Sequence, residues 1–162
     1  MKKIFSVLLL LFILTSLSSC QGVPTPAITQ AEFPFEIVYE KNGEIITASD
    51  VYVCEFEGIE WNENVGKHRQ WKGYVKSTGE STLVLHTEGG IKVTCSLGTA
   101  AYYMSDPLAA TIEEVTPTVQ RVQTFESGGV SSMSLTDEQL WEQYGIRLIT
   151  WAFSAPIENT YE

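Results

Sequence analysis

The chain has 162 residues, with 20 acidic against 10 basic residues and a formal net charge of −10 at neutral pH. This acidic excess argues against binding to nucleic acid or to anionic lipid head groups, because both require basic surface. The length is enough for one domain with a substantial hydrophobic core but hardly for two. We therefore expect a single acidic globular domain with no nucleic-acid partner.

The first residues have the pattern of a targeting segment. A basic start, Met1 to Lys3, precedes an apolar run over residues 4–14. A membrane-spanning helix needs roughly 20 apolar residues, so this run is too short to cross a bilayer unaided. A basic start, an apolar centre and small residues afterwards are typical of a secretory signal peptide.

The stretch Leu17-Ser18-Ser19-Cys20, directly behind the apolar run, resembles the lipobox of bacterial lipoprotein signal peptides. The resemblance implies that residues 1–19 are a removed signal peptide and that the Cys20 thiol carries a diacylglyceryl group, with acylation of the new N-terminus. Two or more acyl chains anchor a protein stably, because each buried CH₂ contributes about 0.8 kcal/mol. The implied location is extracytoplasmic, with a lipid anchor in a bacterial membrane. The alternative is ordinary cleavage nearby, with Cys20 a free thiol.

The composition next predicts a tether followed by one domain. Residues 20–32 contain two prolines and no aromatic residue. Such a segment is expected to form a flexible, extended tether behind the lipidated cysteine. The folded domain is predicted to span residues 33–162.

Residues 34–49 predict a β-hairpin. Asn42-Gly43 suits a type I′ turn, in which both central residues have positive φ. Opposed residues share one face of a hairpin, so this turn would gather apolar side chains into a patch. The expected pairs are Lys41 with Glu44, Tyr39 with Ile46, and Ile37 with Ala48.

A third strand and a second hairpin are expected next. Asp50 should end the first hairpin, and residues 51–58 alternate as a separate strand. In residues 81–98, a three-residue loop from Glu88 to Gly90 would keep the apolar faces together. That loop predicts opposition of Leu85 with Val93, Leu83 with Cys95, and His86 with Lys92.

The C-terminal third predicts two more strands around one helix. Residues 116–125 alternate as a strand, whereas residues 126–134 have the composition of a flexible loop. Residues 146–153 are apolar on both faces, which favours a central strand covered on both sides.

The helix between them has clear boundaries. Thr136 and Gln139 form a capping box, and Leu135 and Leu140 stand at the positions of a hydrophobic staple. Gly145 lies where a left-handed C-terminal cap is expected. Together these elements predict a mainly β fold, sandwich or barrel-like, with about seven strands in hairpins and one short helix near the C-terminus. A small α+β domain is the alternative.

Cys54 and Cys95 fall on strand positions predicted to face inward. Disulfides persist outside the cytoplasm, and a bridge here would close a loop of about 40 residues and stabilise by roughly 4 kcal/mol on the chain-entropy model. Two buried free thiols are the alternative.

The chain lacks the common catalytic and cofactor motifs, including GxSxG, HExxH and GxGxxG. His68 and His86 have no ligand spacing that predicts a metal site. Glu55 and Glu57 share a strand face, but such pairs arise by chance in an acidic chain. We therefore predict no enzyme activity, no metal and no cofactor.

Residues 58–76 are predicted to form a long loop that carries the recognition surface. Aromatic and Arg side chains dominate binding hot spots, and Trp beside Asn also suits stacking on a sugar ring. The alternative is that both tryptophans fill the core while the basic residues face water. The residues proposed for this surface are Trp61, Asn62, Asn64, Arg69 and Trp71.

These features predict a binding or interaction module of the cell envelope, with a protein or a glycan as partner. One alternative is a small envelope hydrolase or an enzyme inhibitor, which requires a cleft that contains Glu55, Glu57 or a histidine. The other alternative is a purely structural lipoprotein.

Overall fold

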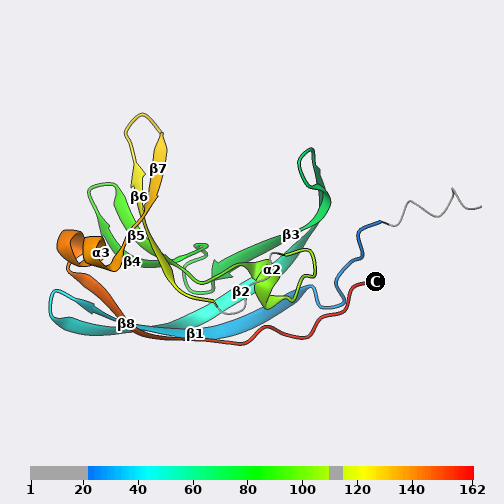
Figure 1. Ribbon diagram of the computed structural model, residues 1–162, viewed down its shortest axis with the longest axis horizontal. Helices are drawn as coiled ribbons and strands as arrows, with labels where there is room; N and C mark the ends of the chain where they lie inside the picture. The colour runs from blue at the N-terminus through cyan, green and yellow to red at the C-terminus, as the bar shows by residue number, and fades with distance from the viewer. Residues whose placement is uncertain (1–21, 110–114) are drawn as a thin grey trace, which may run out of the picture.

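The computed structural model describes residues 22–109 and 115–162, so the lipobox and Cys20 lie outside the described residues. The described chain forms two four-stranded antiparallel sheets (Figure 1). One sheet has the strand order β3-β2-β1-β8 and the other has the order β4-β5-β6-β7. The prediction of a mainly β fold with a short helix near the C-terminus is confirmed.

The strands are β1 (Gln30–Lys41), β2 (Glu44–Asn62), β3 (Gly66–Val75), β4 (Leu83–Glu88), β5 (Ile91–Ser96), β6 (Thr118–Thr124), β7 (Val130–Ser134) and β8 (Ile146–Phe153). The two helices labelled in Figure 1 are α2 (Ala100–Tyr103) and α3 (Asp137–Tyr144).

The β1–β2 hairpin has the predicted register. Asn42 and Gly43 both have positive φ, and all three predicted pairs, from Lys41–Glu44 outward, are observed. The predicted break at Asp50 is wrong, because β2 continues without interruption to Asn62. Asp50 remains in the ladder opposite Phe35, so the second and third predicted strands are one long strand.

Residues 58–76 form a second hairpin and not the predicted long loop. The distal half of β2 pairs with β3, and the register closes at Asn62 opposite Gly66. Gly58 lies at a register shift with a φ of 131°, a conformation that favours glycine. The bulge lets the strand bend there, and the β2–β3 hairpin projects from the body of the protein (Figure 1).

The β4–β5 hairpin combines two registers. At the turn, Glu88 is opposite Ile91, so the loop is the two residues Gly89-Gly90 and not the predicted three. A register shift between Val84 and His86 then restores the predicted pairing of Leu83 with Cys95. His86 consequently lies opposite Val93, and the prediction that it faces Lys92 is wrong. The bulge leaves Leu85 buried.

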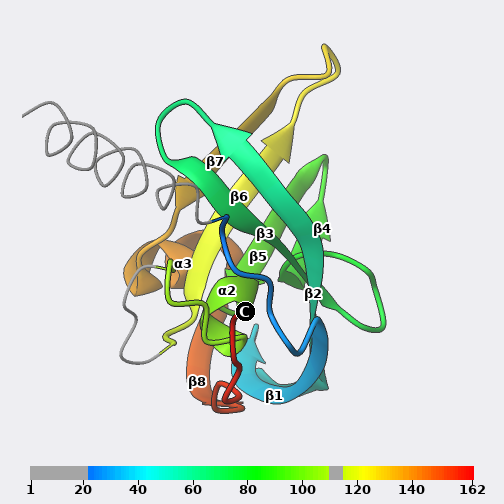
Figure 2. The same cartoon turned by 90° about the vertical axis from the view of Figure 1, so that its right-hand side faces the viewer.

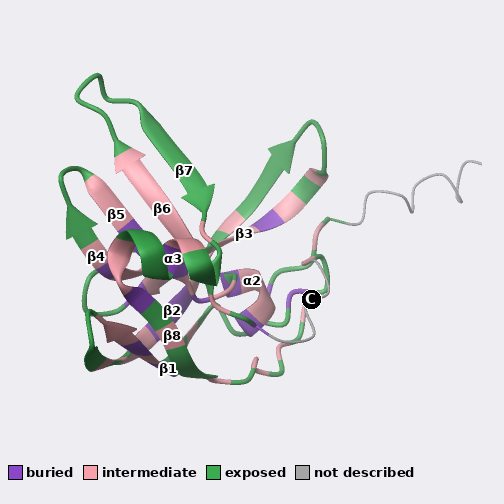
Figure 3. Cartoon of the chain, turned by 60° about the vertical axis from the view of Figure 1, so that its left-hand side comes forward, coloured by how far each residue is buried: buried purple, intermediate pink, exposed green. Residues whose placement is uncertain are grey.

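The predicted strand in residues 116–125 is confirmed as β6, but the predicted flexible loop is wrong in its second half. Val130 to Ser134 form β7, which pairs with β6 through Gln120–Ser134 to Thr124–Val130. All five β7 residues are exposed (Figure 3), so no apolar alternation marks this strand in the sequence.

Helix α3 follows the predicted boundaries. Thr136 and Gln139 make both bonds of the capping box, and Gly145 is left-handed. Strand β8 then follows directly, but the prediction of a central, doubly covered strand is wrong. It is an edge strand beside β1, with Ile149 and Trp151 exposed. The run of apolar residues in β8 is therefore not buried on both faces.

The hydrophobic core lies between the two sheets and is closed by α2 and α3 (Figure 3). Phe33, Ile37 and Tyr52 enter it from the first sheet, and Val93 and Val119 enter it from the second. Tyr103 from α2 packs centrally, with its ring centroid 4.7 Å from that of Phe33, and it donates a hydrogen bond to the Leu97 carbonyl.

Cys54 and Cys95 are both buried in this core, and both are free thiols. The structure thus contains the second alternative, two buried thiols, and not the disulfide. Burial raises the pKa of each thiol to about 12, which suppresses the reactive thiolate.

The predicted tether over residues 20–32 is largely part of the domain. Residues 30–32 belong to β1, and the stretch before them pairs with the C-terminus (Figure 2). The Thr25 N–H donates to the Glu162 carbonyl at 2.7 Å, and the Ala27 N–H donates to the Thr160 carbonyl at 2.8 Å. These backbone bonds, made to residues distant in sequence, place the start of the domain near Pro24 and not at residue 33.

Candidate functional site

The residues predicted to form one recognition surface separate into two groups. Trp61, Asn62 and Asn64 lie at the end of the β2–β3 hairpin, where all three are exposed. Trp61 is 66% exposed to solvent, so it does not fill the core. The Asn62 side chain accepts a hydrogen bond from the Asn64 N–H at 2.8 Å, which shapes the turn.

Arg69 and Trp71 are not part of an exposed surface, and their prediction as recognition residues is wrong. Both are bound to Asp106, which follows α2. Arg69 Nε lies 2.9 Å from Asp106 Oδ2 and Nη2 lies 2.6 Å from Oδ1, while Trp71 Nε1 donates to Oδ2 at 2.7 Å. The side chains of the ion pair are 1% and 4% exposed, so the pair is withdrawn from solvent.

Arg69 also fastens the two ends of the domain. Its Nη1 donates to the Pro24 carbonyl at 2.8 Å, and its guanidinium lies 4.4 Å from the centroid of the Tyr161 ring. Tyr161 in turn donates to the Met104 carbonyl at 2.6 Å. We call Arg69, Trp71, Asp106 and Tyr161 the terminal clasp, and its role is structural.

The charge of the terminal clasp is held in place by hydrogen bonds. Burial alone would raise the pKa of Asp106, but bonds from Arg69, the Leu108 N–H and Trp71 outweigh burial and hold it below its usual value. The hydrogen bond and charge of Asp106 raise the pKa of Arg69. Asp106 is therefore ionised at neutral pH and does not serve as a proton donor.

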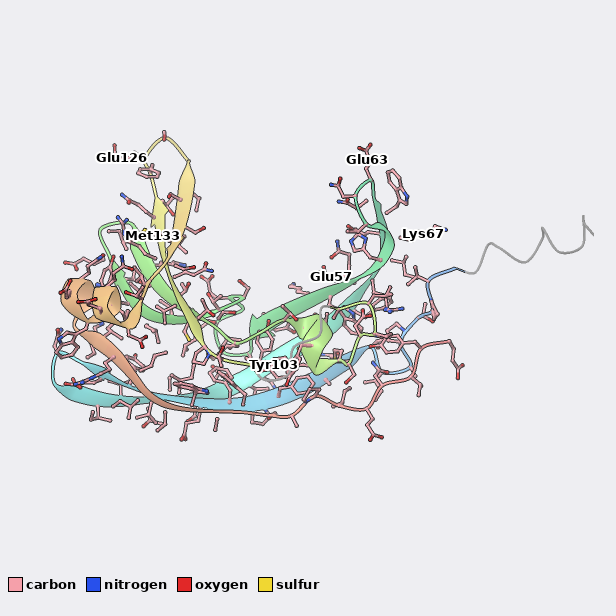
Figure 4. All side chains as sticks on the ribbon, in the orientation of Figure 1. Glu57, Glu63, Lys67, Tyr103, Glu126 and Met133 are labelled. Carbon is pink, nitrogen blue, oxygen red and sulfur yellow. The ribbon has the colours of Figure 1, made fainter. Side chains whose placement is uncertain are left out.

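Half of the exposed large apolar residues in the described part of the chain lie on two hairpins, β2–β3 and β6–β7, which project to the same side of the long β1–β2–β8 layer (Figures 1 and 4). We call these two projections the paired hairpins. Figure 4 shows Glu63 and Lys67 at the end of the β2–β3 hairpin, with Glu126 and Met133 on the β6–β7 hairpin. The large apolar side chains that both hairpins leave exposed are Ile59, Trp61, Val65, Phe125, Val130 and Met133.

A hollow of about 740 Å³ lies beside α3, at the end of the long layer away from the β2–β3 hairpin (Figure 1). Its walls come from the β1–β2 turn, from β4 and from the last turn of α3. His86 stands in this wall with Nδ1 3.1 Å from Lys41 Nζ and Nε2 3.3 Å from the Glu88 carboxylate. The Tyr144 ring lies 5.8 Å from the imidazole.

The other candidate residues have local roles. His68 contacts the Gly66 carbonyl at 3.1 Å, and Glu55 accepts hydrogen bonds from Gln30 and Tyr74. Within residues 22–109 and 115–162, no three His, Cys, Asp or Glu side chains are placed to hold a metal ion. No helix in the described part of the chain has the length and apolar character needed to cross a membrane.

Sequence reasoning missed the β6–β7 hairpin and the hollow. Residues 126–134 are rich in Gly and Ser, which is typical of a loop. The apolar residues Val130 and Met133 were the only sequence signal that this segment contains a strand. The hollow joins three segments distant in sequence, so no local pattern could indicate it. No protein-family model, curated protein or solved structure matches this chain.

Proposed function

We propose that the protein is a lipid-anchored extracytoplasmic lipoprotein that acts as a binding module of the bacterial cell envelope. In this proposal the paired hairpins contact a protein partner, and the protein itself performs no catalytic step. The observation that carries the proposal is that each of the two hairpins, which project to the same side, leaves three large apolar side chains exposed (Figure 4).

The anchor supports a position close to the membrane. Cys20 precedes Pro24 by four residues, and the Pro24 carbonyl is held by Arg69. Four residues span at most about 14 Å in any conformation. With the anchor at Cys20, the domain therefore stays beside the membrane. The paired hairpins would then contact partners that also lie close to the membrane surface.

The chemistry of the hairpins favours a protein partner. Trp61 and Val130 are 66% and 67% exposed, among the largest exposed fractions of any large apolar side chain in the described residues. Exposed apolar groups with a polar rim are typical of protein interaction sites, and Trp is enriched among the residues that dominate binding. The two hairpins carry exposed Glu57, Glu63 and Glu126 beside the single labelled Lys67 (Figure 4), and this acidic excess favours a partner with basic residues around an apolar patch.

Site-specific cross-linking in intact cells tests the proposal. A photoreactive phenylalanine analogue replaces Trp61 in one full-length variant and Val130 in another. Ile45, which is 59% exposed at the β1–β2 turn, is the matched apolar control position. We expect the same cross-linked protein from both hairpin positions and none from position 45.

Coupling between the hairpins makes the test sharper. In the variant with the cross-linker at position 130, Trp61→Ala should reduce the cross-linked product at least fivefold, because one partner contacts both hairpins. An unchanged product, or equal products from position 45, would contradict the proposed surface. Separately, a palmitate analogue should label the wild-type chain and fail to label Cys20→Ser.

A further inference from the structure

We infer that the hollow beside α3 is a binding site for an uncharged saccharide. This site goes beyond the proposed function, because none of the residues that line it is among the exposed apolar residues of the paired hairpins. Its volume of about 740 Å³ is within the usual range of small-molecule sites, about 300–1,000 Å³.

The walls of the hollow are set by specific backbone contacts. The Asn42 N–H donates to the Gly145 carbonyl at 2.9 Å, which joins the β1–β2 turn to the end of α3. Gly145 has a φ of 61°, and a Cβ there would collide with the Asn42 side chain. The hollow is thus formed by a turn and a helix cap that fit each other.

The lining is polar and aromatic throughout. Apart from Gly145, every lining side chain carries a hydrogen-bonding group. A site for a lipid or another apolar ligand would instead be lined mainly by hydrophobic side chains. The Arg147 guanidinium lies over the Trp141 ring, 5.0 Å from its centroid, but Trp141 is still 43% exposed and offers ring surface on which a flat, apolar sugar face can pack.

The hydrogen-bonding groups suit hydroxyls in particular. Lys41 Nζ, which can only donate, lies 3.1 Å from His86 Nδ1, and the Glu88 carboxylate lies 3.3 Å from His86 Nε2. This arrangement leaves two N–H donors on Lys41, while the Glu88 carboxylate accepts and Asn42 can do both. A sugar hydroxyl also donates and accepts, so adjacent hydroxyls can satisfy such mixed partners.

The charges in the lining disfavour a charged ligand. Lys41 contributes a positive charge, whereas Glu88 and Glu142 contribute negative ones. The C-terminal end of α3 adds partial negative charge from its carbonyls. An anion would face the two carboxylates and a cation would face Lys41, so a neutral polar ligand fits best.

Fluorescence titration of the full-length chain tests the assignment. The lipoprotein is purified in a zwitterionic detergent, because a detergent with a sugar head group would compete. The probes are maltotriose, cellotriose and chitotriose, with inorganic phosphate and spermidine as the charged probes. We expect at least one trisaccharide to change the tryptophan emission with saturation, while phosphate and spermidine do not.

Two exposed tryptophans provide a matched pair of variants. Trp141 and Trp151 are 43% and 44% exposed, but only Trp141 lines the hollow. We expect Trp141→Ala to weaken binding of the trisaccharide at least tenfold, measured by thermal shift, and Trp151→Ala to leave it unchanged. Gln143→Ala, on the exposed side of α3, should weaken binding about threefold without affecting folding.

Each contrary result overturns the inference. Saturable binding of phosphate or spermidine alone would assign the hollow to a charged ligand. Trisaccharide binding that survives Trp141→Ala would place the saccharide elsewhere. No response to any trisaccharide at 50 mM, from a chain that unfolds cooperatively, would remove the assignment, while the paired hairpins and their cross-linking test would stand unaffected.

Discussion

Arg69 on β3 and Asp106 behind α2 form a buried ion pair through two parallel contacts, 2.9 Å from Nε to Oδ2 and 2.6 Å from Nη2 to Oδ1. The same guanidinium holds the Pro24 carbonyl and covers the Tyr161 ring, so one side chain joins both ends of the domain. A bidentate pair of this kind is geometrically specific. It fixes where the N-terminal segment leaves the domain, and with it the distance to the proposed anchor.

Replacing Asp106 should destabilise the protein strongly. Asp106→Asn keeps the size of the side chain but leaves the Arg69 charge buried without a partner, which typically costs about 3–5 kcal/mol. The matched control is Glu32→Gln, which breaks the Lys76–Glu32 pair, 2.7 Å apart but half exposed. That exposed pair should contribute only about 0–1 kcal/mol. Urea unfolding of both variants measures the difference, and equal losses would contradict the buried role of Asp106.

The stability difference between wild type and Asp106→Asn should depend on pH. The pKa of Asp106 is lowered in the folded state, where hydrogen bonds from Arg69, Leu108 and Trp71 outweigh burial. A lowered pKa means that the ionised carboxylate stabilises the fold above its unfolded value of about 3.9, and that this contribution is lost as the pH falls through the folded value. We expect a constant difference in unfolding free energy between pH 5 and 7 that shrinks below about pH 4. A difference that instead grows on acidification would contradict the lowered pKa.

Gly73→Ala should destabilise the protein although this position has no unusual backbone conformation. A Cβ at residue 73 would collide with the ring and hydroxyl of Tyr52, which is buried and packs against Tyr103. Overpacking of a core typically costs about 1–3 kcal/mol. Gly129→Ala is the matched control, because its nearest neighbour would be Phe125 at an ordinary 3.7 Å. Thermal unfolding should show a clear loss for Gly73→Ala and almost none for Gly129→Ala.

The two buried thiols should be unreactive in the folded protein. Burial raises the pKa of both Cys54 and Cys95 to about 12, so the thiolate is scarce at pH 8. In a Cys20→Ser variant, we expect iodoacetamide to modify neither cysteine under native conditions and both after unfolding in guanidinium chloride. Mass spectrometry counts the added groups. Rapid modification of the native protein at pH 8 would contradict the burial of these thiols.

The sequence by itself determined the elements whose signals are local. Asn42-Gly43 set the register of the first hairpin, because a type I′ turn leaves only one way to pair the flanking strands. Thr136, Gln139 and Gly145 set the boundaries of α3, because capping uses side chains within a few residues of each helix end. Alternation of apolar residues likewise placed Tyr52 and Cys54 on the buried face.

Only the tertiary structure decided how distant segments meet. The sequence pattern predicted that Arg69 and Trp71 are recognition residues. In the folded chain both side chains donate hydrogen bonds to Asp106, which is more than thirty positions away in sequence. Strand β8 is apolar on both faces, which predicted a central strand. It lies at the edge of its sheet, because sheet position depends on which strands pair. Turns and caps are settled by neighbours along the chain, whereas burial, sheet order and the walls of a hollow depend on contacts that form only when the whole chain folds.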